Sequence, residues 1–101
     1  MRGAFGMNEF TKKSIEDNID SFCEALNQHI ENNAKQGYFN CRKSFEISEI
    51  PKTLEGEPCI FIAKDRLQKL GYIVFIEETK SVSHIYTITV SWSDSEVSKN
   101  V

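Results

Sequence analysis

The last third of the chain reads GYIVFI at residues 71–76 and, after a charged stretch, IYTITVSW at residues 85–92, and these two runs decide the fold. The second run alternates apolar and polar side chains, which predicts a half-buried strand with Tyr86 and Trp92 at the two ends of its apolar face. The first run predicts a strand that is apolar on both faces. Together the two runs predict a sheet with one face buried in the core.

The rest of the chain predicts two helices and one more strand. A helical stripe indicates a leading helix from about Thr11 to Gln36, closed by Gly37, a residue that readily adopts the left-handed conformation. The members of this stripe are Ile15, Ile19, Phe22, Leu26 and Ile30. Period-two alternation predicts a strand over 38–47, the polar residues 48–57 predict a loop, and a second helical stripe covers 58–70.

We therefore predict an α+β fold with the order α-β-α-β-β, in which two helices pack on one face of a three-stranded sheet. The last strand either inserts between the other two, giving the order 1-3-2, or lies at an edge. Its clean apolar face favours insertion. A leading helix of about 39 Å is longer than strands of roughly 20 to 27 Å, so one end is expected to overhang the sheet.

The chain is expected to form one domain over residues 8–92, preceded by a flexible leader or cloning scar, 1–7, and followed by a polar tail, 93–101. Twelve Lys and Arg against 15 Asp and Glu give a formal charge of −3, which argues against a general nucleic-acid binder. No run reaches the roughly 20 apolar residues of a membrane span, and the start of the chain lacks the apolar core of a signal peptide. We expect a cytosolic protein.

The sequence spells out no catalytic or ligand-binding signature. The three cysteines are widely spaced and, with His29 and His84, do not form the close pairs that a zinc site needs; they are expected to act as small core residues. The glycines form no phosphate-binding loop, and no serine lies in a nucleophile elbow. We expect no enzyme activity, no metal and no cofactor.

Three features carry a resemblance. The acidic leading helix, the step Leu70-Gly71-Tyr72-Ile73-Val74 and the closing run Thr87-Ile88-Thr89-Val90-Ser91-Trp92 resemble small α+β proteins of bacteriophages and prophages, over residues 8–92. The resemblance implies a virion component or a factor that acts on host proteins, in the host cytosol or in the particle, and it implies no catalytic residues.

Two surfaces are candidates for function. Because one sheet face lacks helices, an apolar row of the strand at 72–76 must meet solvent, the overhang of the leading helix or another copy of the chain, unless the N-terminal leader or the polar tail covers it. We favour homo-oligomerisation or a host or virion protein partner. The predicted interface residues are Tyr72, Val74, Ile76, Ile85 and Thr87. The alternative is a small nucleic-acid-associated regulator that stacks bases on the first strand, through Tyr38, Arg42 and Lys43. A third reading, an enzyme whose site forms only between subunits, would require a shared polar cleft.

Overall fold

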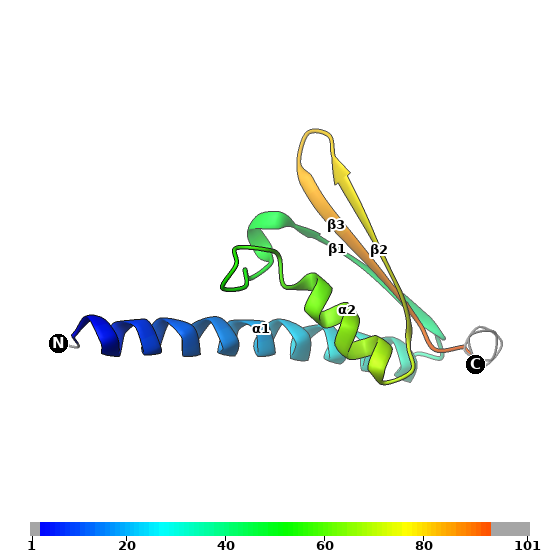
Figure 1. Cartoon of the computed structure of the whole chain (residues 1–101). Helices are drawn as coiled ribbons and strands as arrows, with labels where there is room; N and C mark the ends of the chain where they lie inside the picture. Colours follow the sequence, from blue (N-terminus) through cyan, green and yellow to red (C-terminus); the bar gives the residue numbers. More distant parts are fainter. Residues whose placement is uncertain (1–2, 94–101) are drawn as a thin grey trace.

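The computed structural model describes residues 3–93, and it has two helices on one face of a three-stranded antiparallel sheet (Figure 1). The elements, in chain order, are α1 (Ala4–Lys35), β1 (Asn40–Glu46), the short 3₁₀ helix η1 (Ile47–Glu49), α2 (Ile60–Lys69), β2 (Ile73–Lys80) and β3 (His84–Ser91). The predicted fold class is confirmed. The predicted tail lies outside the described residues, except for Ser93.

The strand order is β1-β3-β2, so the last strand inserts between the other two, as its apolar face predicts. It pairs antiparallel with both neighbours, which leaves β1 and β2 as parallel edge strands. The register places Val90 between Cys41 and Val74, and Ile88 between Lys43 and Ile76. A central strand has a neighbour on each side, so its side chains are the least accessible to solvent. Val90 and Ile88 of β3 are among the most deeply buried of the described residues.

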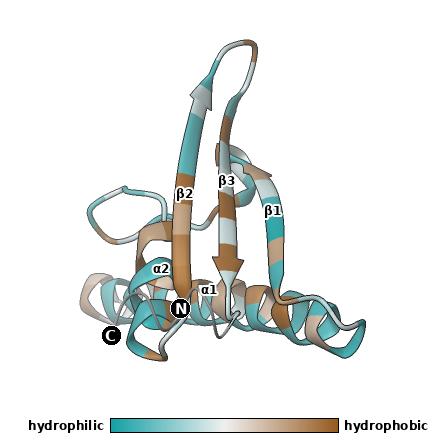
Figure 2. Ribbon diagram, turned by 90° about the vertical axis from the view of Figure 1, so that its right-hand side faces the viewer, coloured by the Kyte–Doolittle hydropathy of each residue, from teal (hydrophilic) through white to brown (hydrophobic). Residues whose placement is uncertain are grey.

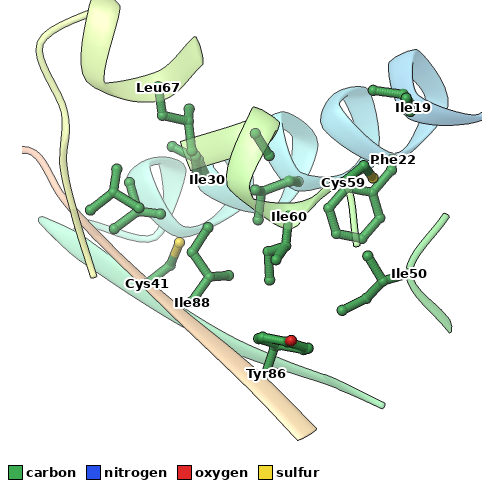
Figure 3. Packing of buried hydrophobic residues seen from close by; sticks show 14 residues of the cluster. Ile19, Phe22, Ile30, Cys41, Ile50, Cys59, Ile60, Leu67, Tyr86 and Ile88 are labelled. Carbon is green, nitrogen blue, oxygen red and sulfur yellow. The ribbon is translucent and has the colours of Figure 1, made fainter. Parts of the chain in front are cut away.

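The core lies where the C-terminal half of α1, all of α2 and the lower ends of the strands meet (Figure 3). Ile19, Phe22, Leu26 and Ile30 supply the α1 side, as the helical stripe predicts. Ile60, Ala63 and Leu67 supply the α2 side. Ile50, from the segment predicted as a plain loop, is also buried in this core. That segment is thus anchored, because one isoleucine turns inward directly after η1.

Both helices end in the same way. Gly37 has φ +91° and Gly71 has φ +97°, a conformation that costs other residues energy because of their Cβ atom. In each case the residue after the glycine is a tyrosine, whose N–H donates to a carbonyl five residues back. These bonds run from Tyr38 to Asn33 at 3.1 Å and from Tyr72 to Leu67 at 3.2 Å. This Schellman arrangement satisfies helix-end carbonyls and turns the chain directly into a strand.

The leading helix starts earlier than the sequence predicts. It begins at Ala4 and spans 32 residues, so residues 4–7 are helical and the expectation of a flexible leader is wrong for them. At 1.5 Å per residue α1 is about 48 Å long, whereas an eight-residue strand spans about 26 Å. The predicted overhang is confirmed: the N-terminal half of α1 projects beyond α2 and the sheet (Figure 1).

The sheet also projects, in a different direction. The β2–β3 hairpin rises away from both helices, and its strands reach Lys80 and His84, where the sequence predicts a longer polar turn from Glu77. Figure 2 shows that β2 changes from hydrophobic in its lower half to hydrophilic in its upper half. The strand pairing continues past the helices because backbone hydrogen bonds hold it there, and its side chains are polar because both faces meet solvent.

Candidate functional site

The sheet has a face covered by the helices and an open face. On the open face lie Ile73, Phe75, Glu77 and Thr79 of β2, Ile85, Thr87, Thr89 and Ser91 of β3, and Asn40, Arg42, Ser44 and Glu46 of β1. The covered face holds the core residues of the strands. Any interface built on the sheet must therefore use the open face.

The predicted interface residues are divided between these two faces. Val74 is 5% exposed within the core, and Tyr72 and Ile76 pack against that core from the same face. Ile85 and Thr87 lie on the open face. The five residues therefore form no common surface, and the predicted set is wrong as one patch. Alternation separates the two faces of β2 correctly, but it does not say which face the helices cover.

The apolar residue of β2 that is most exposed lies on the opposite side from the predicted row. Phe75 is 65% exposed on the open face, where it lies beside Thr89 of β3. Ile73 and Ile85 on the same face are half-buried. The patch is small, because the rest of the open face is polar and forms contacts within the sheet. Ser44 Oγ and Thr87 Oγ1 are 2.8 Å apart, and Arg42 Nη2 lies 3.8 Å from Glu77 Oε2.

The three residues predicted to contact nucleic acid do not converge. Arg42 is on the open face and is ion-paired with Glu77 across the sheet. Lys43 points to the other face, where its Nζ is 5.4 Å from the centre of the Phe45 ring. Tyr38 is exposed in the turn between α1 and β1. Base stacking on a strand needs aromatic and basic groups on one side, and this strand divides them.

Three exposed large apolar side chains lie on the overhang of α1, two of them in residues 1–7, which the sequence predicts to be a leader. We call residues 4–14 the arm. Apart from Gly6, every residue from 4 to 13 is exposed. The large apolar side chains among them are Phe5, at 81% exposure, Met7 and Phe10. Met7 and Phe10, three residues apart, lie on one side of the helix, and Phe5 lies on another side, so the three form no continuous apolar stripe. Their size in a polar stretch was the available signal.

A groove of about 310 Å³ lies between α1 and α2. Its floor is apolar, from Leu26, Ala63 and Leu67, and Leu70 lies at its α2 end with 74% of its surface exposed. Asp20, Cys23, Glu24, Asn27 and Arg66 complete the lining. The groove thus combines an apolar floor with a charged rim, which is the usual composition of a site for an apolar side chain.

One ion pair spans the two helices at this groove. Arg66 Nη1 donates to Asp20 Oδ1 at 3.1 Å, and both side chains are about half exposed. Cys23 is half-buried beside them, and burial raises the pKa of its thiol, while the nearby Arg66 lowers it in part. Burial raises the pKa of Cys41 and raises that of Cys59 to about 11. Thiols with raised pKa values are poor nucleophiles at neutral pH.

A polar cluster lies in the part of the projecting hairpin next to its turn, where Glu78 pairs with Tyr86 and Lys80 with His84. His84 Nε2 donates to Glu78 Oε2 at 2.6 Å, and the His84 ring lies 5.0 Å from the Tyr86 ring. The Glu78 carboxylate accepts hydrogen bonds from the Tyr86 hydroxyl and from His84, which hold its pKa below its usual range, the Tyr86 bond having the larger effect. The hydrogen bond that Tyr86 donates to Glu78 also raises the pKa of Tyr86. Phe61 covers the edge of Tyr86 at 5.8 Å. These contacts join the two strands of the hairpin to α2.

Among residues 3–93, no group of three or more His, Cys, Asp or Glu side chains is arranged to hold a metal ion. In the same range, neither helix is long and apolar enough to cross a membrane. No family model, curated protein or solved structure that was compared with the chain matches it. The arm, the groove and the open face are the candidate contact surfaces within residues 3–93.

Proposed function

We propose that this protein is a non-enzymatic accessory or structural protein that acts by self-association and by binding other proteins. Its sequence pattern favours an origin in a phage or mobile element, and a role in the host cytosol or in a virion. The single observation that carries the proposal is the arm. An exposed helix with three large apolar side chains is a surface that proteins usually bury against a partner.

Two further features support contact as the mode of action. The open face adds Phe75 to the exposed apolar surface, and the groove between α1 and α2 offers an apolar floor. Within the described residues, the titratable clusters hold the fold together: Asp20 and Arg66 join the helices, and Glu78, His84 and Tyr86 join the hairpin. These arrangements favour binding over chemistry.

The proposal is tested by measuring the mass of the untagged chain in solution, by light scattering from low to high micromolar concentration. We expect a dimer or a larger assembly whose population rises with concentration. A strict monomer over the whole range would contradict self-association. Immobilised chain that then also captures no protein from a bacterial lysate would overturn the proposal as a whole.

A further inference from the structure

The arm is a weak helix by itself. Its N-cap is Gly3, which makes no side-chain capping bond, and its first turn holds no acidic residue. Gly6 lies inside the helix, where glycine costs about 1 kcal/mol relative to alanine. The arm continues a helix that is packed further along the chain, so it needs no nucleus of its own. Most helical stability in proteins comes from packing, and residues 4–13 are exposed apart from Gly6, so a cover over the arm is expected to strengthen this part of the helix.

The two halves of α1 differ in charge, and this difference indicates which partner covers the arm. The arm carries Glu9 against Lys12 and Lys13, so it is slightly basic. Residues 16–31 of the same helix carry five carboxylates and no lysine or arginine. Two α1 helices side by side in parallel would place the acidic halves together, whereas antiparallel helices place each arm against the acidic half of the other.

The register of such a pair brings the arm to the groove. If a two-fold axis lies beside Ile15 and Glu16, residue 5 of one copy is level with residue 26 of the other, since both helices rise equally per residue. Leu26 lines the groove, and the exposed Leu70 lies at the same end. The most exposed side chain of the arm thus meets an apolar floor.

We infer that two copies of this chain exchange arms, each arm of α1 lying antiparallel over the α1–α2 groove of the other copy. Phe5 is the apolar anchor, and Leu70 forms the far edge of its site. Lys13 is level with residue 18 of the second copy, next to Asp17 and within one turn of Asp20. The inference rests on the proposed self-association and specifies its interface.

The test measures the dimer dissociation constant of the full chain by sedimentation equilibrium. Phe5→Asp in the arm and Leu70→Asp at the groove are each expected to weaken the dimer by at least about tenfold. Both sites are exposed, so neither change should unfold the domain. Val82→Asp at the fully exposed hairpin tip is the matched control and should leave the dissociation constant unchanged. Phe75→Asp tests the competing interface on the open face, and arm exchange predicts that it also leaves the dissociation constant unchanged.

Charge reversal tests the antiparallel register independently. Lys13→Glu is expected to weaken the dimer, and adding Asp17→Lys to the same chain should restore it, because the two positions face each other across the axis. Hydrogen exchange over residues 4–14 should slow as the wild-type concentration rises, since the arm becomes ordered when it is covered.

The outcomes separate this inference from the proposed function. A dimer that tolerates Phe5→Asp, Leu70→Asp and Lys13→Glu, yet dissociates with Phe75→Asp, overturns arm exchange and leaves self-association in place through the open face. A wild-type chain that stays monomeric at high micromolar concentration overturns both. A dimer that the arm and groove variants weaken, and that Phe75→Asp and Val82→Asp leave unchanged, supports arm exchange and the proposed self-association.

Discussion

Ser44 Oγ and Thr87 Oγ1 lie 2.8 Å apart on the open face, at directly paired positions of β1 and β3. Thr87 is nearly buried because its strand is central, so its hydroxyl depends on this partner. We expect Ser44→Ala to lower the free energy of unfolding by about 0.5–1.5 kcal/mol. Adding Thr87→Val should cost less than the sum of the single changes, which a double-mutant cycle in urea measures.

A core substitution should be far more damaging than a change at the hairpin tip. Ile88→Ala removes methyl groups from a residue that is 1% exposed in the central strand. Such changes lower the free energy of unfolding by about 2–5 kcal/mol. Val82→Ala, at a fully exposed valine, is the control and should leave the urea midpoint unchanged. Equal effects of the two would contradict the placement of the core.

The glycine at the end of α2 should tolerate asparagine better than alanine. No atom lies within 4 Å of where a Cβ at Gly71 would stand, so the cost of a side chain there comes from its φ of +97° alone. We expect Gly71→Ala to lower the free energy of unfolding by about 1–2 kcal/mol, since alanine disfavours this conformation. Gly71→Asn should lose less, because asparagine adopts it more readily. Thermal denaturation of both variants gives the comparison.

The cysteines should react slowly in the folded protein. Burial raises the pKa of Cys23 and Cys41, and it raises that of Cys59 to about 11. At pH 8 we expect iodoacetamide to modify Cys23 first and Cys59 last, with all three modified quickly in denaturant. Mass spectrometry over time gives the order. Rapid labelling of Cys59 in the native chain would contradict its burial.

The hairpin cluster should contribute to acid sensitivity. The pKa of Glu78 is lower in the folded chain than in the unfolded one, so its contribution is present near neutral pH. That contribution falls as the pH drops from about 4.5 through the lower folded value, because the protonated carboxyl loses its bonds from Tyr86 and His84. Glu78→Gln should therefore flatten the dependence of stability on pH in this window. Urea midpoints at several acidic pH values, for both chains, provide the test.

Much of the architecture follows from two periodicities in the sequence. The regular alternation that ends at Trp92 favours the central position for β3 over the edge, and the strand order β1-β3-β2 confirms this preference. The stripe from Ile15 to Ile30 predicts which side of α1 is buried. Gly37 and Gly71 mark both helix ends. In each case a local sequence pattern matches what the fold requires at that place: a buried strand face, a buried helix side, or a left-handed residue at a helix end.

The errors arise where no single periodicity applies. The arm has helical backbone without an apolar stripe, so Phe5 and Met7 gave no sign of a helix that extends past its own core. In β2 both faces are apolar, and only the position of the helices decides that Val74 is buried and Phe75 is not. Ile50 and Leu54 are the two large apolar residues of the predicted loop, and no pattern shows that Ile50 is buried while Leu54 is 60% exposed. Only the tertiary structure separates them.

The hairpin beyond Lys80 has a practical consequence. Residues 81–83 stand clear of the helices, every one of them is exposed, and Val82 makes no contribution to the core. A fluorophore or a short affinity handle inserted there would sit far from the arm and leave it free. The molecule thus offers a point of attachment for single-molecule or pull-down experiments that stands away from the arm and the helices (Figure 1).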